Sequence, residues 1–242
     1  PILEDKSNLV FNKNFYTGYS PERIVPGDKI NTIEKIIKVV SGSNAKTLEI
    51  ISNIYASIND AGIHEAPSIK VAEAAKVIEN IQRDVNIGLI NEIYMACDVL
   101  DINFKNVYKL ASSKWNFLKF KPGLVGGHCL PVDPYYFSHI CTNNNFTTKI
   151  TLAGRSINDS MTINIQRKIE KIFKSKNFEK KKKILLCGLT YKKNVADLRN
   201  SLPLKIFKNL NKKYKIIKGF DPIINNKTAK KFGILNSSLK IK

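Results

Sequence analysis

A lone cysteine lies in a glycine-rich segment, where Gly126, Gly127 and His128 come directly before Cys129. Glycine has no Cβ, so the backbone on either side of it can approach a ligand closely. A thiolate at such a position can attack an aldehyde and then carry an acyl group, because sulfur combines nucleophilicity with leaving ability. The loop alone leaves a second interpretation open, since a single cysteine is commonly a small buried apolar residue. His128 is interpreted as a loop residue, because an adjacent side chain need not reach the thiol.

The segment that must position this thiol is irregular. Residues 121–134 contain Pro122, Pro131, Pro134 and four glycine or histidine positions between them, which is too many breakers for a regular helix or strand. We therefore predict a structured loop that presents Cys129.

A long helix is predicted to begin after Ser68, its N-cap, and to run to about Leu100. Its apolar residues recur at helical spacing along one stripe: Val71, Ala74, Ala75, Ile78, Val85, Leu89 and Ile93. Such a length favours a connecting or dimer-forming spine. The opposite face carries Lys76, Asn80, Arg83 and Asn91, and periodicity alone favours an ordinary solvated face for these four.

Other elements flank this helix. The pattern predicts an apolar strand over 36–40, a break over 41–44, helices over 45–58 and 150–173, and a strand over 184–188. A loop over 189–200, a helix over 201–210 and a strand over 214–220 that ends at Asp221 follow. The order of strand, loop, helix and strand over residues 184–220 indicates a β-α-β unit.

The composition bounds the class of protein. A chain of 242 residues predicts two packed units. No run approaches the roughly 18 apolar residues of a membrane span, and the polar first ten residues do not resemble a secretory signal, so a cytoplasmic protein without a membrane partner is expected. The net charge of +20 invites a nucleic-acid interpretation, but only five of the 40 basic residues are arginine, so no specific nucleic-acid partner is expected.

The four cysteines show no C-x-x-C pairing and are expected to be reduced thiols. His128, Cys129, His139 and Cys141 do not match a common zinc-ligand spacing. We therefore expect no metal.

Four motifs carry a family resemblance, and they occur in this order: Tyr19-Ser20-Pro21-Glu22-Arg23 with Pro26-Gly27, the run from Glu73 to Asn80, Gly126-Gly127-His128-Cys129 with Asp133-Pro134, and Gly188-Leu189-Thr190-Tyr191-Lys192 with Asp197-Leu198-Arg199. The chain resembles the UDP-glucose/UDP-mannuronate dehydrogenase family from its first residues to nearly its last. The segment from Trp115 into Gly127 is most similar to members that act on UDP-N-acetylhexosamines.

The resemblance implies a four-electron oxidation of a sugar C6 alcohol to a carboxylate, with two NAD used in succession. It implies that Cys129 is the nucleophile, which would hold the sugar as a thioester. Lys76 and Asn80 match positions that stabilise oxyanion charge, and their i,i+4 spacing places both on one helix face. Glu22 matches the carboxylate that activates water, and Asp133 matches the acid that supports the thiol and water network.

The same resemblance implies the binding residues. Lys192 matches a diphosphate-binding lysine of the UDP-sugar domain, and Arg199 matches an arginine that reaches the NAD pyrophosphate. The loop from Phe120 through Gly123 to Gly126 is implied to wrap the sugar nucleotide.

The expected fold is α/β, with three parts. Residues 1–65 are expected to be the C-terminal part of a Rossmann-like NAD domain, and residues 66–175 a central all-α dimerisation and catalytic domain built on the long helix. Residues 176–242 are expected to be a partial Rossmann-like UDP-sugar-binding domain. No strand followed by G-x-G-x-x-G is present, so we expect most of the NAD domain to be missing and this polypeptide not to turn over alone.

The complete protein is expected to be a homodimer or larger assembly through the long helix. Two alternatives remain at this stage: the same chemistry on UDP-glucose or UDP-N-acetylmannosamine, and an inactive binding or assembly module.

Overall fold

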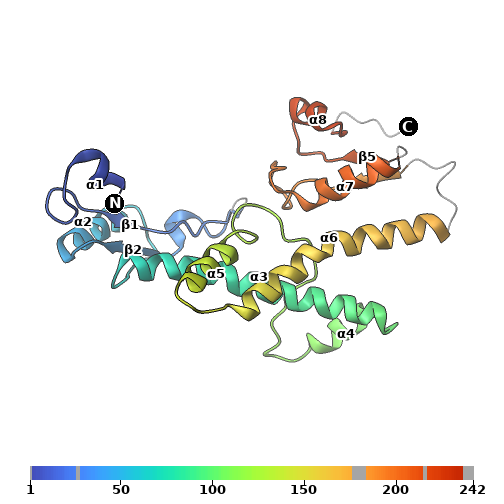
Figure 1. Ribbon diagram of the computed structural model, residues 1–242, viewed down its shortest axis with the longest axis horizontal. Coiled ribbons are helices and arrows are strands. Elements are labelled where there is room, and N and C mark those ends of the chain that lie inside the picture. Colours follow the sequence, from blue (N-terminus) through green and yellow to red (C-terminus); the bar gives the residue numbers. More distant parts are fainter. Residues whose placement is uncertain (1, 26–27, 176–183, 215–216, 237–242) are drawn as a thin grey trace. The chain divides into compact units, whose positions relative to one another are not determined.

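The computed structural model describes residues 2–25, 28–175, 184–214 and 217–236 (Figure 1). It is a mixed α/β fold with long central helices and small sheets. The chain divides into two compact units, residues 1–79 and 80–242, and the division falls inside one continuous helix. The three-domain division stays a prediction, since packing separates only these two units. The Pro26-Gly27 pair of the first motif lies outside the described residues.

The first unit is a small sheet with one covering helix. Its elements are α1 (Ile2–Ser7), β1 (Gly18–Tyr19), the 3-10 helix η1 (Ile33–Lys35), β2 (Lys38–Gly42), α2 (Ala45–Ala56) and β3 (Ile63–Glu65). The sheet order is β1-β2-β3, with β2 antiparallel to β1 and parallel to β3. Strand β2, helix α2 and strand β3 therefore form a β-α-β crossover.

The break predicted over 41–44 is partly wrong, because Ser41 and Gly42 belong to β2. They pair with Tyr19 and Gly18 of β1, a ladder that local sequence does not reveal. A Cβ at Gly42 would lie 2.3 Å from the backbone nitrogen of Leu48, so glycine is what lets α2 start this close to the strand. The predicted helix is confirmed as α2.

Helix α3 (Ile69–Val99) confirms the predicted long helix. The hydroxyl of Ser68 accepts a hydrogen bond from the amide of Val71, as expected of an N-cap residue. The helix spans 31 residues without interruption.

Three further helices make up the central region: α4 (Phe104–Ala111), α5 (Asp133–Asn143) and α6 (Lys149–Ser175). Helix α6 was predicted and is confirmed, whereas α4 and α5 were not predicted. Asp133 and Pro134 were assigned to the loop, but they form the first turn of α5. Proline is tolerated there because the first helical amides have no partner within the helix.

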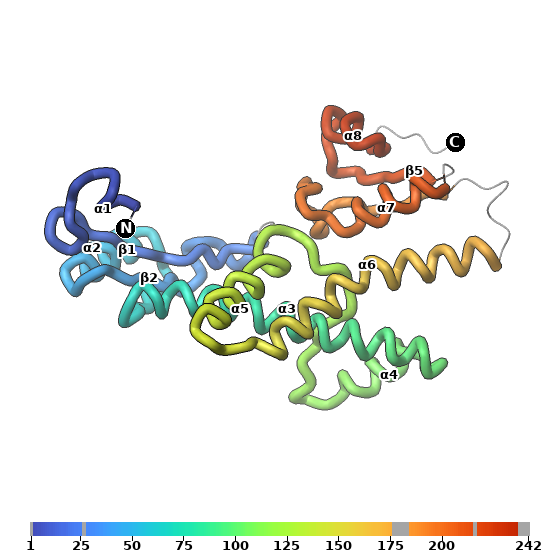
Figure 2. The backbone as a smooth tube through the Cα atoms, viewed as in Figure 1, coloured from blue at the N-terminus to red at the C-terminus, as the bar shows by residue number. Residues whose placement is uncertain are grey.

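Helices α3 and α6 cross in Figure 2, and Gly88 and Gly154 lie where their backbones touch. A Cβ at Gly88 would lie 2.8 Å from the carbonyl oxygen of Gly154, and a Cβ at Gly154 would lie 3.2 Å from the Cα of Val85. The two backbones are therefore in direct contact at this point.

The C-terminal elements are β4 (Ile184–Cys187), α7 (Leu202–Lys213), β5 (Ile217–Phe220) and α8 (Asn226–Phe232). Strands β4 and β5 are parallel, which confirms the β-α-β unit. Helix α7 extends past the predicted end at Leu210, and Tyr214, predicted as the first residue of the strand, is its C-cap. Residues 215–216 of the predicted strand lie outside the described residues.

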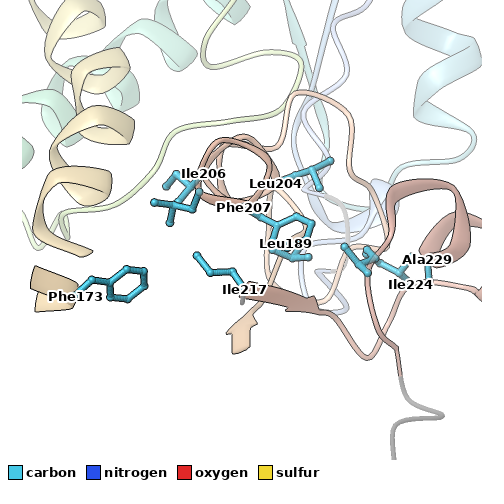
Figure 3. Packing of buried hydrophobic residues seen from close by; sticks show 10 residues of the cluster. Phe173, Leu189, Leu204, Ile206, Phe207, Ile217, Ile224 and Ala229 are labelled. Atoms are coloured by element: carbon cyan, nitrogen blue, oxygen red, sulfur yellow. The ribbon is translucent and has the colours of Figure 1, made fainter. Parts of the chain in front are cut away.

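A buried apolar cluster holds this region together, and it joins α6, α7, β5 and the segments next to them (Figure 3). Its largest fully buried members are Leu189, Leu210 and Ile217. Burying a side chain of this kind contributes about 1.5–3 kcal/mol. No helix in the part of the chain that the structure describes is both long and apolar enough to cross a membrane.

Candidate active site

Cys129 lies at the end of the loop that connects α4 to α5, and its side chain is exposed. Its carbonyl oxygen accepts hydrogen bonds from the amides of Val132 and Asp133, each at 2.9 Å. The cysteine therefore lies at the start of the turn over residues 130–132 that leads into α5. The partial positive charge at a helix N-terminus favours negative charge that develops nearby.

Asn80 and Asp133 are joined directly. The Nδ2 of Asn80 on α3 donates a hydrogen bond to Oδ2 of Asp133 at 2.6 Å. The side chain of Asn80 is buried, at 4% exposure. The side chains of Asn80 on α3 and Asp133 on α5 are thus brought together, and the backbone of Cys129 is joined to that of Asp133.

The solvated face that periodicity favours on α3 is wrong for Asn91, whereas for Asn80 the family resemblance already implied a place in the site. Asn91 is fully buried, whereas Arg83 on the same face is exposed. Each buried asparagine has a hydrogen-bond partner in a segment more than 30 residues away, Asp133 for one and Gly123 for the other. These partners are what make burial of the amides possible.

Lys76 lies one helical turn before Asn80 on α3 and is half-buried. Glu22 belongs to the first unit and is mostly exposed. Its Oε1 accepts the amide of Ile24 at 2.6 Å, and its Oε2 lies 3.7 Å from Nζ of Lys38.

Lys38 is a residue that sequence reasoning missed. It is 6% exposed, and its ammonium group also donates to the carbonyl of Pro21 at 3.2 Å. The signal was available, because Lys38 interrupts the otherwise apolar run over residues 36–40. A buried lysine needs partners of this kind, and here it steadies the Glu22 segment.

The glycine loop is tied to the segment after β4. Asn200 accepts the amide of Gly127 at 3.4 Å and donates its Nδ2 to the Gly127 carbonyl at 3.2 Å. Gly127 has a φ of +96°, and a Cβ there would lie 2.9 Å from the ring of Tyr191. A Cβ at Gly126 would lie 2.7 Å from the Asn200 carbonyl oxygen. Both glycines are required for this close approach.

Arg199 and Asp197 form a pair beside the loop. The Arg199 guanidinium donates to both Asp197 oxygens at 2.7–3.1 Å, and these bonds hold the pKa of Asp197 well below its usual range. The Nε2 of His128 lies 3.4 Å from the same carboxylate. Arg199 remains 75% exposed, so its guanidinium is accessible to an anion.

Lys192 and Phe120 are both half-buried. The Lys192 carbonyl accepts the Thr190 hydroxyl at 3.2 Å, which shapes the turn after β4. The same turn is fixed by Asp221, whose buried Oδ2 accepts the amides of Leu189 and Thr190 at 2.7 and 3.0 Å.

A cavity of about 770 Å³ lies between the loop and α7. Val125 and Gly126 line one side, and Lys205, Lys208 and Lys212 are among the residues that line the other. Cys129 does not line it, so we do not assign the reacting carbon to this cavity.

Two models of one family match this chain. The central domain of the UDP-glucose/GDP-mannose dehydrogenase family matches residues 70–160, and the UDP binding domain of the same family matches residues 185–241.

Similar proteins and structures agree with these matches. The chain is 49% identical over 232 residues to Protein CapL of Staphylococcus aureus, covering 96% of this chain and 54% of that protein. It is 44% identical over 237 residues to the UDP-N-acetyl-D-glucosamine 6-dehydrogenase of Salmonella typhi, covering 97% of this chain and 56% of that enzyme. The chain thus spans about half the length of the curated relatives it matches.

Among solved structures, the UDP-D-ManNAc dehydrogenase of Pyrococcus horikoshii has a TM-score of 0.81 at 28% identity, covering 93% of this chain and 53% of that one. The UDP-N-acetyl-mannosamine dehydrogenase Cap5O of Staphylococcus aureus has a TM-score of 0.78 at 30% identity, covering 93% of this chain and 52% of that one.

Proposed function

We propose a function from the premise that this chain belongs to the UDP-glucose/GDP-mannose dehydrogenase family. The whole protein oxidises the C6 alcohol of a UDP-N-acetylhexosamine to a carboxylate, and Cys129 is the nucleophile. Such a product is a precursor for surface polysaccharide synthesis.

The observation that carries this proposal is the hydrogen bond between Asn80 and Asp133 beside the loop turn of Cys129. An amide donor, a carboxylate and an exposed thiol are the groups that thioester chemistry requires. They come from three separate segments, and mere packing does not require that combination.

The chemistry of the chain's own residues follows. The Cys129 thiolate adds to the C6 aldehyde, so that a C–S bond forms and the carbonyl oxygen becomes an oxyanion. Lys76 and Asn80 stabilise this charge. After the second oxidation, water activated by Glu22 attacks the thioester, the C–S bond breaks, and the thiol and carboxylate are released. The roles of Lys76 and Glu22 rest on the family resemblance.

NAD supplies the acceptor for two hydrides when it is bound. Arg199 fits a contact with its pyrophosphate, since its guanidinium is exposed and already binds a carboxylate through two nitrogens. The 242 residues contain no G-x-G-x-x-G turn, so Arg199 would be an auxiliary contact and not the main cofactor site. Lys192 binds the substrate diphosphate, and the loop of Phe120, Gly123 and Gly126 surrounds the sugar.

The substrate class rests on the relatives. The chain is 44–45% identical to two UDP-N-acetyl-D-glucosamine 6-dehydrogenases and 33–34% identical to several UDP-N-acetyl-D-mannosamine dehydrogenases. The higher identity favours the N-acetylglucosamine type.

A homodimer through α3 is part of the proposal. The apolar stripe of α3 is largely exposed in the single chain, with Ile78 at 53% and Leu89 at 54%. A second copy of this helix would cover such a stripe. Light scattering of the whole protein measures its mass directly, and a monomer would contradict this part.

The test uses the whole protein, supplied in turn with UDP-N-acetylglucosamine, UDP-N-acetylmannosamine and UDP-glucose while NADH is followed. We expect the first to give the highest kcat/KM. We expect Cys129→Ser to lower NADH formation by about 10³-fold or more. Cys187→Ser is the matched control, because that thiol is also exposed. Undiminished turnover in Cys129→Ser would remove the nucleophile role, and turnover with UDP-glucose alone would overturn the substrate class.

A further inference from the structure

Asn91 binds both backbone groups of one loop glycine. Its Oδ1 accepts the amide of Gly123 at 2.8 Å, and its Nδ2 donates to the Gly123 carbonyl at 3.0 Å. The Asn91 side chain is fully buried, although it is on a helix face that periodicity assigns to solvent. A Cβ at Gly123 would meet no atom within 4 Å, so the protein leaves open space beside this residue. Asn91 thus fixes the loop backbone from one side and leaves that space available to a ligand.

The orientation of the Asn91 amide is itself fixed. Its Nδ2 also donates to Oδ1 of Asn158 on α6 at 2.8 Å. The Nδ2 of Asn158 in turn donates to the carbonyl and carboxylate oxygens of Asp84 at 2.9 and 2.8 Å. A reversed Asn91 amide would place its oxygen against two acceptors, and buried polar groups do not tolerate such a mismatch.

The same network reaches the loop on the other side of Cys129. Arg155 is fully buried and forms an ion pair with Asp84. Its Nη2 donates to Asp159 at 2.9 Å, and its Nη1 lies 3.5 Å from the carbonyl oxygen of Leu130. Residues 123 and 130 are therefore both linked to one buried network between α3 and α6, and Cys129 lies between them.

We propose that Asn91 is a positioning residue, which acts through Gly123 to hold the loop that presents the nucleophile and surrounds the sugar nucleotide. This inference rests on the proposed function for its catalytic consequence. A reacting group displaced by about 1 Å can lose about 10²-fold in rate, so a fixed loop backbone has a measurable effect. The paired bonds to Gly123 supply that fixation before substrate binds.

The test compares Asn91→Leu with Asn86→Ala in the whole protein. Leucine keeps the branched shape of the Asn91 side chain, although its methyl groups are larger, and removes both bonds to Gly123. Asn86 is the matched control, because it lies on the same helix and its amide donates only within that helix, to the Gln82 carbonyl.

Two readouts are needed. First, hydrogen exchange at the amide of Gly123 should rise at least about tenfold in Asn91→Leu and stay unchanged in Asn86→Ala. Second, the KM for the UDP-sugar should rise at least about fivefold and kcat/KM should fall about 10- to 100-fold. Loss of folded protein alone lowers Vmax and leaves KM unchanged, so the KM separates positioning from a merely structural role.

Unchanged exchange at Gly123, or faster exchange with wild-type KM and kcat/KM, would overturn the proposal. A wild-type protein that forms no NADH with any of the three sugars refutes the proposed function. Hydrogen exchange at the amide of Gly123 then tests by itself whether Asn91 holds the loop. Should Asn91→Leu fail to fold, Asn91→Asp takes its place, because aspartate keeps the acceptor for the Gly123 amide but cannot donate to both the Gly123 carbonyl and Asn158. Exchange at Gly123 and the KM should then both rise above their wild-type values, and wild-type values of either would overturn the proposal.

Discussion

The crossing of α3 and α6 gives a prediction whose size follows from the structure. The two helix backbones meet at Gly88 and Gly154 with no side chain between them. We consider Gly88→Ala and Gly154→Ala, which add the same methyl group on opposite sides of one contact.

Two opposing effects decide the stability of each variant. Alanine is favoured over glycine inside a helix by about 1 kcal/mol, and overpacking a tight contact costs about 1–3 kcal/mol. At Gly88 the new Cβ would lie 2.8 Å from a carbonyl oxygen and 3.0 Å from a Cα, and both atoms belong to the backbone of Gly154. Backbone atoms cannot turn aside, so the packing cost lies in the upper part of its range, at about 2–3 kcal/mol. After the helix gain of about 1 kcal/mol, we expect the free energy of unfolding to fall by about 1–2 kcal/mol.

At Gly154 the nearest atoms are the Cα of Val85 at 3.2 Å and its Cγ2 at 3.3 Å. A shift of a few tenths of an ångström relieves this contact, so the helix gain and the packing cost nearly cancel. We expect a change within about 0.5 kcal/mol of zero.

Urea unfolding, followed by circular dichroism, measures both variants against the wild type. The m-values should agree among the three proteins, which shows that the denatured states are comparable. The direct backbone contact between Gly88 and Gly154 would be contradicted if Gly88→Ala were as stable as the wild type. It would also be contradicted if Gly154→Ala lowered the free energy of unfolding more than Gly88→Ala.

Two further predictions concern ion pairs. Burial raises the pKa of Asp84 despite the nearby Arg155 charge, so Asp84 can take up a proton when its partner is lost. Arg155→Met should therefore cost about 3 kcal/mol. Asp84→Leu should cost about 4–5 kcal/mol, because it removes the buried partner of the guanidinium and leaves it paired with the half-exposed Asp159; the reverse order in urea unfolding would refute this reasoning. The Arg199 hydrogen bonds hold the pKa of Asp197 below its ordinary value of 3.8, so the stability from this pair is present above about pH 4 and is lost as the pH falls below that value. Arg199→Gln should raise the pKa of Asp197 in a carboxyl-carbon NMR titration, and an unchanged pKa would exclude Arg199 as the cause.

Much of the fold was predictable because long periodic segments determine their own structure. Helix α3 and helix α6 are each several turns long, and each has enough apolar positions for the helical period to be clear. The parallel pair of β4 and β5 followed from apolar runs separated by a capped helix. Helix α5 was missed because Pro131 and Pro134 dominate the local signal, although proline in a first helical turn is compatible with a helix.

The candidate site was less predictable from the residues themselves. A glycine-rich cysteine loop indicates a presented thiol, but only the family resemblance selected Asn80 and Asp133. Nothing in the sequence around Asn91 indicates that its partner is Gly123, 32 residues away. Burial of an amide depends on a tertiary partner, and single-sequence periodicity carries no information on such partners.

Helix α3 inverts the usual amphipathic arrangement between its two faces. At about 100° per residue, Asn80, Asp84 and Asn91 fall within about 40° of one another, and Leu89 lies about 180° from Asn80. The three polar residues are buried and hydrogen-bonded to α5, α6 and the cysteine loop, while Leu89 is 54% and Ile93 36% exposed. A buried polar face is stable only when each group has a partner, and an exposed apolar face on so long a helix is stable only when something covers it. The inversion therefore connects the two proposals: the polar face of α3 organises the site within one chain, and the apolar face remains for a second copy.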